Sequence, residues 1–376
     1  MKFCFAYDSA YPWFNGGIEK RRYLIMQELA RAGNEVHCFT MFREGMPGRR
    51  FRHKGVNYHC VANATPAGEM YKEGRRNMAW PLKYAALLPL EIADYKFDLI
   101  DADAFPFLHI PRLAIYAKIS GAKFVVTWHE VWDKKYWYKY LEGLGIFGYA
   151  MEKLSASLSS NIIVNTSQTR HALAKVFGMR KKKIRVLPAA ISRREMVAFA
   201  KRHPRKAGGN FVVVGRLVPE KRVEMAITAV AATKLGLTVI GSGPERQRLE
   251  ALARRLDASE RIHFVEGMEE EALMMEVRNA RALLMFSERE GMSIISIEAL
   301  ALGTPVIITH DTSIPAEIKK YCHAINPRSA GGELERLVKS KNSILYKKSS
   351  HTEKVLREFS VEGAAKIYEE IAKRGK

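Results

Sequence analysis

Two glutamates in the last third of the chain have a spacing that could support chemistry. Glu290 and Glu298 are separated by seven residues in the stretch SEREGMSIISIEALALGTPVI, residues 287–307. An apolar run before them predicts a buried strand, and Ser293–Leu302 has the pattern of a helix that stops at a Gly-Thr-Pro sequence. We therefore expect Glu290 on the turn before the helix and Glu298 on the helix itself.

The start of this predicted helix is suited to binding an anion. The first backbone N–H groups of a helix have no acceptor within the helix, and they point toward any group placed at its N-terminus. A phosphate would fit there, whereas helix capping or a solvated surface position is the alternative role for the two glutamates. The N–H groups concerned belong to Ser293, Ile294 and Ile295.

Two cations follow another predicted strand. In VVVGRLVPEKRVEMAI, residues 212–227, Gly215 ends a strand, Arg216 lies in the next turn, and Lys221 stands five residues later at the start of a helix. An arginine binds phosphate through two hydrogen bonds and a lysine acts as a compact charge, so the pair suits a diphosphate. Ordinary surface positions remain the alternative for both residues.

Apolar patterning predicts the elements that must position these residues. Lys2–Tyr7 has the pattern of a buried strand, Ile18–Ala32 that of a helix, and Glu35–Met41 that of a second strand, which together make one βαβ unit. Strands separated by helices predict a parallel sheet with helices on both faces. Further strands are predicted at Asp98–Ala102, Lys123–Trp128, Asn161–Asn165 and Ile184–Leu187.

A second series of strands and helices follows residues 191–210, a basic stretch with Pro and Gly that we interpret as a linker between domains. Its strands are predicted at Phe211–Gly215, Thr238–Gly241, Arg261–Val265, Ala282–Phe286 and Pro305–Thr309. The sequence therefore predicts an α/β protein with two Rossmann-like domains. Ligands are expected in a cleft between the facing strand ends.

Length and composition agree with two globular domains. A chain of 376 residues exceeds the size of one hydrophobic core, and 47% apolar with 27% charged residues excludes wholesale disorder. The net charge of +21 predicts an anionic partner, which could be nucleic acid, membrane headgroups or a phosphorylated small molecule. Residues 1–200 contain 31 Lys and Arg against 17 Asp and Glu, so most of the excess lies there.

The cysteines and the apolar runs exclude some classes of protein. No two cysteines form a CxxC pair, and Cys4 and Cys38 lie in apolar strand-like runs, so neither a zinc site nor a disulfide is expected for Cys4, Cys38, Cys60 and Cys322. The N-terminus has no leader pattern, and no apolar run approaches the ~20 residues that span a bilayer. We expect a cytoplasmic protein, with peripheral contact to the inner face of a membrane as a further option.

The two motifs resemble the signature segments of a large family of retaining GT-B enzymes, glycosyltransferase family 4, also called glycosyl transferases group 1. These segments are EGMSIISIEALALGTPVI and GRLVPEKR. The resemblance extends in the same order over nearly the whole chain, through NGGIEK near the N-terminus, TWHE at 127–130, VNTSQTR at 164–170 and IGSGPE at 240–245.

The resemblance implies a role for each matching residue. Glu298 would hold the donor ribose, Glu290 the transferred sugar, and His129, followed by Glu130, would stand in the catalytic region. Arg216 and Lys221 would bind the diphosphate. The implied catalytic residues are His129, Glu290, Arg216 and Lys221, and the implied donor-binding residues are Gly16, Gly17, Gly215, Arg216, Lys221, Glu290, Gly291, Met292, Ser293, Ile294 and Glu298.

The chain departs from the family pattern at two places. The turn that ends the first domain reads Pro188-Ala189-Ala190-Ile191-Ser192, where relatives often have an Asn-Gly pair. After the second signature, HDTSIPAEIKKYCHAI replaces the usual Gly-rich turn and keeps only Pro315 and Glu317. These changes put in doubt the contacts with the donor that relatives make near both turns.

Asp101 and Asp103 form a pair that could hold Mg²⁺ on a diphosphate. Such a pair is typical of the other glycosyltransferase fold, GT-A, and here we expect it to end a strand. We predict no metal site, because Arg216, Lys221 and the helix N–H groups could stabilise the leaving diphosphate without a cation.

Aromatic and basic residues alternate in VWDKKYWYKYLEGLGIFGYA, residues 131–150. This composition suits contact with a membrane interface or stacking on a sugar or RNA, and aromatic packing inside the domain is the alternative. Two other basic clusters, Arg49–Lys54 and Arg180–Arg185, have the composition of loops.

The sequence thus predicts a retaining transferase that moves a sugar from a nucleoside-diphosphate sugar to a hydroxyl of a glycan or lipid-linked acceptor. No cofactor and no nucleic acid are expected, and an anionic membrane surface is a candidate partner. Residues 1–195 would meet the acceptor and residues 205–355 the donor, with a helix at about 358–376 packing back on the first domain. The alternatives are another GT-B sugar-nucleotide enzyme, such as an epimerase, and a basic nucleic-acid-binding protein.

Overall fold

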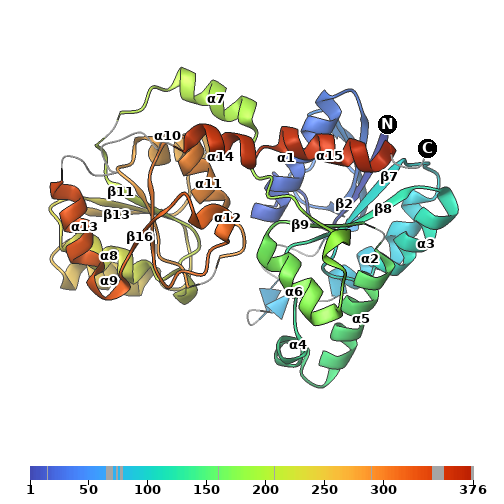
Figure 1. Ribbon diagram of the computed structural model, residues 1–376, viewed down its shortest axis with the longest axis horizontal. Coiled ribbons are helices and arrows are strands. Elements are labelled where there is room, and N and C mark those ends of the chain that lie inside the picture. Colours follow the sequence, from blue (N-terminus) through green and yellow to red (C-terminus); the bar gives the residue numbers. More distant parts are fainter. Residues whose placement is uncertain are drawn as a thin grey trace. The chain divides into compact units, whose positions relative to one another are not determined.

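Figure 1 shows the computed structural model of the chain. The structure describes residues 1–14, 16–64, 71–72, 75–76, 79–159, 161–206, 208–288, 290–340 and 351–373. The contacts within the chain define two compact units. Unit 1 comprises Met1–Ala190 and Val361–Lys376, and unit 2 comprises Ile191–Ser360.

Unit 1 is built on an eight-stranded sheet with the order β10-β9-β8-β7-β1-β2-β4-β3. All neighbouring strands are parallel except β3, which pairs antiparallel with β4 at the edge. The strands are β1 (Lys2–Ala6), β2 (Glu35–Phe42), β3 (Arg50–His53), β4 (Val56–Asn63), β7 (Leu99–Asp103), β8 (Lys123–Trp128), β9 (Asn161–Val164) and β10 (Ile184–Val186). A separate hairpin joins β5 (Tyr71–Lys72) to β6 (Arg75–Arg76).

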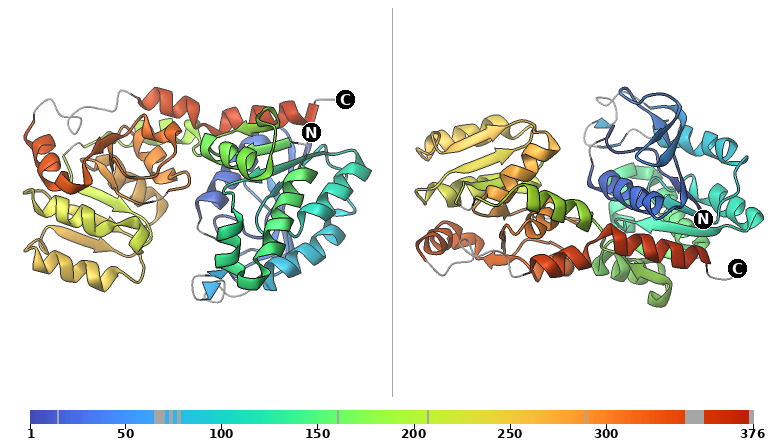
Figure 2. Two further views of the ribbon diagram at one scale, coloured as in Figure 1. Left: turned by 60° about the horizontal axis from the view of Figure 1, so that its bottom comes forward. Right: turned by 90° about the horizontal axis from the view of Figure 1, so that it is seen from above.

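Helices cover both faces of this sheet because the strands are apolar on both sides (Figure 2). Along β1, Phe3 and Phe5 face one core, which includes helices α1 (Gly17–Arg31) and α15 (Val361–Lys373). Cys4 and Ala6 face the opposite core. The remaining helices are α2 (Ala79–Ile92), α3 (Ile110–Ser120), α4 (Lys134–Leu141), α5 (Gly145–Leu158) and α6 (Ser167–Phe177), with short 3-10 helices η2 (Glu142–Leu144) and η3 (Lys181–Lys183).

Unit 2 contains a six-stranded parallel sheet with the order β13-β12-β11-β14-β15-β16. Its strands are β11 (Phe211–Val214), β12 (Leu237–Ile240), β13 (Ile262–Val265), β14 (Leu283–Met285), β15 (Val306–Thr309) and β16 (His323–Ile325). Its helices are α7 (Arg193–Arg202), α8 (Val223–Ala231), α9 (Arg246–Arg255), α10 (Glu270–Asn279), α11 (Ile294–Ala301), α12 (Ala316–Lys319), α13 (Ala330–Lys339) and α14 (Thr352–Glu358), with 3-10 turns η4 (Pro219–Lys221) and η5 (Pro327–Ser329).

The structure corrects two interpretations of basic segments. The stretch 191–210 was expected to be a linker, yet it contains α7, whose first turn is capped by Ser192 and whose Met196 and Phe199 are buried. The cluster at residues 49–54 was expected to be a loop, yet it contains the edge strand β3. Helix α7 has a buried face and β3 a half-buried one, and each has charged residues on its other face, which concealed this spacing.

Within the described ranges, no helix is long and apolar enough to cross a membrane. The four cysteines are free thiols, and Cys4, Cys38 and Cys60 are buried. Burial raises the pKa of the Cys38 thiol to about 12. These thiols therefore pack as small apolar groups rather than as reactive ones.

The buried side chain of Glu152 joins α5 to α4 and to the segment just before α4. Glu152 of α5 accepts hydrogen bonds from Trp137 Nε1 at 2.6 Å and from the backbone N–H of Trp132 at 3.0 Å. The two helices pack closely there, because a Cβ on Gly148 would lie 2.1 Å from the Trp137 ring. Burial raises the pKa of Glu152 to about 7.

This shift predicts how the stability of unit 1 depends on pH. The folded protein keeps the Glu152 proton until about pH 7, whereas the unfolded chain releases it near the ordinary pKa of 4.5. The contribution of Glu152 to the free energy of unfolding is therefore largest below that value and falls as pH rises toward 7. Glu152→Gln should lose less stability than the wild type between pH 5 and pH 8.

All five tryptophans lie in unit 1, so urea unfolding followed by tryptophan fluorescence reports on that unit. The same exchange at the exposed Glu44 is the control, and it should leave the wild-type dependence unchanged. If Glu152→Gln loses as much stability as the wild type over this interval, the buried proton is not held by Glu152.

Candidate active site

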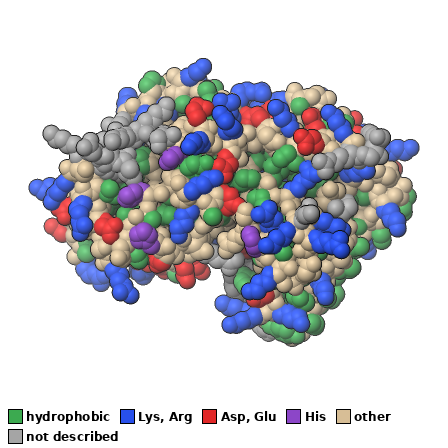
Figure 3. Space-filling view, in the orientation of Figure 1, with side chains coloured by type: hydrophobic (Ala, Val, Ile, Leu, Met, Phe, Trp, Pro, Cys, Tyr) green, Lys and Arg blue, Asp and Glu red, His purple; other side chains and the backbone are tan. Residues whose placement is uncertain are grey.

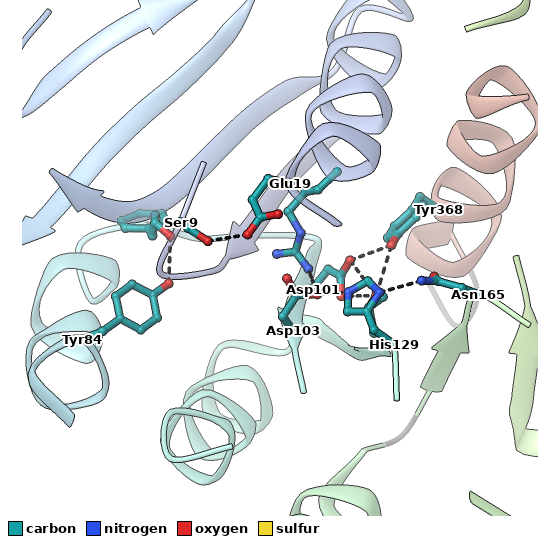
Figure 4. Close-up of polar contacts among 11 residues, drawn as sticks. Ser9, Glu19, Tyr84, Asp101, Asp103, His129, Asn165 and Tyr368 are labelled. Carbon is teal, nitrogen blue, oxygen red and sulfur yellow. Dashed lines mark hydrogen bonds and ion pairs between the residues drawn. The ribbon is translucent and has the colours of Figure 1, made fainter. Parts of the chain in front are cut away.

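Polar side chains gather where three neighbouring strands of unit 1 end. Parallel strands end at the same edge of a sheet, so residues far apart in the chain meet there. Figure 4 shows these side chains turned toward one another. The group comprises Asp101 and Asp103 of β7, Thr127 of β8, His129 and Asn165 just after β8 and β9, and Tyr368 of α15.

His129 is held by a partner on each ring nitrogen. Its Nε2 lies 2.9 Å from Oδ1 of Asp103, and its Nδ1 lies 2.6 Å from the amide nitrogen of Asn165. Because an amide nitrogen can only donate, Nδ1 accepts and Nε2 carries the proton that is donated to Asp103. These two partners set the orientation of the ring, and the His129 side chain is 13% exposed.

Asp103 is buried and forms an ion pair with Arg22 of α1, whose side chain is also buried. Burial opposes ionisation of Asp103, but the charge of Arg22 and the contact with His129 hold its pKa below the usual value. The carboxylate is therefore ionised and orients His129, as the carboxylates that partner catalytic histidines do. Arg22 in turn connects this site to α1.

Asp101 has different partners from Asp103 and a pKa shifted the opposite way. Tyr368 donates to its Oδ2 at 2.6 Å, and Thr127 donates to its Oδ1 at 2.8 Å. Burial raises the pKa of Asp101. The pair ends a strand, as expected, and the two carboxylates bind different protein groups. Among the described residues, no cluster of three or more His, Cys, Asp or Glu side chains could hold a metal ion.

Gly16, the residue before α1, has a steric role within the protein. Gly16 precedes the helix and Gly17 is its first residue, while Asn15 of the same motif lies outside the described residues. A Cβ on Gly16 would lie 2.0 Å from Oε2 of Glu19, which is buried and accepts a hydrogen bond from Ser9 at 2.8 Å. Gly16 therefore leaves room for the Glu19 carboxyl, whose pKa is raised by burial.

In unit 2 the two signature segments meet. The ammonium of Lys221 contacts Oε1 of Glu290, and Ser287 donates to the same oxygen at 2.9 Å. A backbone hydrogen bond of 2.8 Å from Glu288 to Glu220 joins the two loops beside this pair. The glutamate motif and the cation motif, which the sequence analysis treated separately, therefore form one charged cluster at the carboxyl ends of β11 and β14.

A small pocket opens beside the cluster, and close backbone packing shapes it. Gly215, Arg216, Lys221 and Ser287 line this pocket. Gly241, which follows β12, has a φ of +144°, and a Cβ there would lie 1.9 Å from the carbonyl oxygen of Gly215. Only glycine allows the two strand-end loops to approach this closely.

The start of α11 follows Glu290, as predicted. Ser293 is the residue before the helix, with a φ of +41°, and its hydroxyl lies 2.7 Å from that of Ser296. Glu298 lies in the second turn and is 5% exposed. Of the other predicted donor-binding residues, Gly291 and Met292 lie in the loop between Glu290 and the helix, and Ile294 is the first residue of α11.

Arg222, which the sequence analysis did not single out, holds this loop in place. It has a φ of +46°, its Nε donates to the carbonyl oxygen of Phe286 at 2.7 Å, and its guanidinium pairs with Asp311 at 2.8 Å. The hydrogen bond from Arg222 keeps the pKa of Asp311 below its usual value. Because Arg222 follows Lys221 in the sequence, it has the pattern of one more surface cation. Its position in the sequence does not indicate these contacts.

Two α/β units with largely parallel sheets, each with polar groups at the carboxyl ends of its strands, have the architecture of the GT-B fold. The family model described as "Glycosyltransferase Family 4" matches residues 15–194. The model described as "Glycosyl transferases group 1" matches residues 198–326. The chain belongs to this family, which confirms the resemblance of its motifs.

Relatives and a solved structure agree with this assignment. Residues of this chain are 26% identical over 167 residues to glycogen synthase of Mycobacterium tuberculosis, covering 43% of this chain and 40% of the relative. They are 30% identical over 169 residues to D-inositol 3-phosphate glycosyltransferase of Acidothermus cellulolyticus, covering 40% and 38%. Each match therefore spans about two fifths of the relative. The fold is similar to that of sucrose-phosphate synthase from Thermosynechococcus elongatus, with a TM-score of 0.76, 18% identity and 98% of each chain covered.

The buried ion pair between Arg22 and Asp103 yields a prediction about stability. Arg22→Met leaves the Asp103 carboxylate buried without its cation, which should lower the free energy of unfolding of unit 1 by about 3–5 kcal/mol. The double variant with Asp103→Asn should lose less than the sum of the two single variants, because they remove the same interaction.

Urea unfolding with tryptophan fluorescence measures these differences. Arg31→Met is the control, since Arg31 pairs with Glu28 at 3.5 Å on the surface and such pairs contribute at most about 1 kcal/mol. Additive losses in the double variant would show that Arg22 and Asp103 stabilise unit 1 independently.

Proposed function

We propose that this chain is a retaining glycosyltransferase that moves a sugar from a nucleoside-diphosphate sugar to a hydroxyl group of a glycan or lipid-linked acceptor. The observation that carries the proposal is the contact between Lys221 and Glu290, which joins the two signature loops beside Arg216 at the strand ends of unit 2. A cationic cluster next to an acidic group suits a diphosphate attached to a neutral sugar.

In the proposed reaction, the acceptor oxygen bonds to the anomeric carbon while the bond from that carbon to the β-phosphate oxygen breaks. The phosphate oxygen takes the electron pair, and the proton of the acceptor hydroxyl passes to it on the same face of the sugar. Negative charge grows on the departing diphosphate, so cations and N–H groups placed there lower the barrier most. We assign this role to Arg216, Lys221 and the N–H groups at the start of α11.

We give the remaining acidic and imidazole groups the roles that the family resemblance implies. Glu290 is assigned to the transferred sugar, either as a charge that stabilises an oxocarbenium-like centre or as a nucleophile, and Glu298 to the donor ribose. His129 is assigned to the reacting region of unit 1. Because Asp103 and Asn165 both hold its ring, its orientation is set before any substrate binds.

A panel of nucleotide sugars tests the proposal directly. A donor present at 100 times its Kd should stabilise the protein by about 2.7 kcal/mol, which thermal unfolding detects. Product analysis with the stabilising donor then distinguishes a transferase from a sugar-nucleotide epimerase. The absence of stabilisation by every nucleotide sugar, together with salt-sensitive binding to nucleic acid, would contradict the proposal.

Two substitutions test the donor site. Lys221→Ala removes a cation assigned to the diphosphate, and Glu298→Ala removes the carboxylate assigned to the ribose, so each should weaken donor binding by about 1.5–3 kcal/mol. Calorimetric titration with the stabilising donor measures the change. Lys234→Ala, an exposed cation of the same unit, is the control. Unchanged affinity in both test variants would remove the assignment.

The cofactor requirement has its own test. If Arg216, Lys221 and the N–H groups of α11 stabilise the leaving group, transfer should continue in excess EDTA. Activity is measured as released nucleoside diphosphate, with and without added Mg²⁺ or Mn²⁺. Activity that disappears with EDTA and returns with the metal would instead assign Asp101 and Asp103 as ligands.

A further inference from the structure

The exposed apolar side chains of this protein are gathered in one part of the chain. Within the described ranges, every large apolar side chain that is exposed lies between residues 82 and 158, on α2, α3, α4, η2 or α5. Helices α1 and α15 and the whole described part of unit 2 have none. Single exposed apolar residues are common on soluble proteins, but such a concentration marks an interaction surface.

Six of these side chains define what we call the apolar surface. They are Leu82 and Leu90 of α2, Ile115 and Ile119 of α3, and Ile146 and Phe147 of α5, with exposed fractions between 51% and 81%. On α3 the two are four residues apart, and on α2 they are eight apart, so each pair lies on the outer side of its helix.

The three helices are neighbours on the same face of the sheet. Helix α3 packs against both α2 and α5, and all three contribute to one core. Figure 2 shows them side by side along unit 1. Their outer sides therefore lie next to one another on unit 1.

The exposed charges on the helices of the apolar surface are mostly positive, while Asp94, Glu130 and Asp133 are exposed in the segments beside them. The exposed cations on these helices are Lys83 of α2, Arg112 and Lys118 of α3, Lys134, Lys135 and Lys139 of α4, and Lys153 of α5. Among the acidic residues of α2, α3, α4 and α5, Glu91 pairs with Arg50, and Glu152 is buried against the tryptophans. Figure 3 shows hydrophobic side chains beside Lys and Arg at the end of unit 1 formed by α4 and α5.

Apolar side chains bordered by flexible cations are the pattern of a surface that lies on an anionic bilayer. The apolar side chains enter the headgroup region, and the lysines extend to the phosphates. A second protein would be expected to place acidic residues against a compact cationic patch, whereas the cations here are spread over four helices among exposed apolar side chains. This distribution of charge favours a lipid surface.

We propose that unit 1 docks on an anionic membrane through the outer sides of α2, α3 and α5, with the lysines of α4 alongside. Arg49 and Arg50 are engaged with Asn63 and Glu91, and Arg52 and Lys54 lie at the β3 edge, which has no exposed large apolar residue. The basic cluster at residues 49–54 is therefore not part of the proposed docking surface.

Docking of this kind would hold the transferase where lipid-linked acceptors are found, but the docking proposal does not rest on the catalytic one. Binding to vesicles needs neither donor nor turnover. The donor titration of each variant separates the two, because none of these residues belongs to the site in either unit.

Co-sedimentation of the full chain with vesicles tests the proposal. We compare vesicles of phosphatidylcholine alone with vesicles that also contain phosphatidylglycerol, at low and physiological salt. The wild type should bind the anionic vesicles more tightly. Lys135→Ala with Lys139→Ala should lower the partition coefficient about 25-fold, since each cation near such a surface contributes about fivefold. Ile119→Ser with Phe147→Ser should lower it at least about tenfold, and this loss should persist at high salt.

Arg254→Ala with Arg255→Ala is the matched control, because these exposed cations of α9 lie in unit 2 and should not affect binding. Thermal unfolding checks that every variant is folded. Equal binding to both vesicle types, no binding to either, or equal losses in the control variant would overturn the proposal. So would a wild-type dimer that Ile119→Ser with Phe147→Ser dissociates while vesicle binding is absent, since the surface would then be occupied by a second copy.

Discussion

The polar site of unit 1 depends on one buried ion pair. Arg22 and Asp103 come from α1 and β7, and neither could be buried alone at acceptable cost. Once paired, Asp103 stays ionised and can accept a hydrogen bond from Nε2 of His129. One ion pair thus joins α1 to β7 and to the end of β8. Asp101, two residues away, has a raised pKa and binds Tyr368 of the last helix. The return of the chain to unit 1 thus reaches the same edge of the sheet.

In unit 2 the polar site depends on close backbone packing rather than on a buried ion pair. Gly241 approaches the carbonyl oxygen of Gly215 too closely for any side chain, and this draws together the loops after β11 and β12. Lys221 of the loop after β11 contacts Glu290 of the loop after β14. Arg222 holds the loop after β14 through its hydrogen bond to the carbonyl oxygen of Phe286. The side chains of Lys221 and Glu290 remain partly exposed, at 24% and 10%, as the proposed binding of a diphosphate requires.

Cations that lie beside exposed apolar side chains and cations that pair with carboxylates have different physical consequences. In unit 1 the cations of α2, α3, α4 and α5 accompany exposed apolar side chains, so their attraction to anions is coupled to burial of apolar area. Cations elsewhere, such as Arg222 and Arg31, have carboxylate partners on the protein. The net charge of +21 therefore overstates how many cations are available to a partner and says nothing of where they gather.

The sequence by itself determined the two α/β units, most of the strands and the order of the family motifs, because buried parallel strands are short apolar runs with little ambiguity. It also placed Glu290 before a helix and Glu298 within it. It missed α7 and β3, whose charged faces hid their spacing, and it also missed the strands β4 and β16. Only the tertiary structure decided that Arg22 pairs with Asp103, that Tyr368 reaches Asp101 across 267 residues of chain, and that the apolar residues of three helices share one surface. These contacts join residues distant in the chain, and local spacing carries no information about which distant residues the sheet brings together.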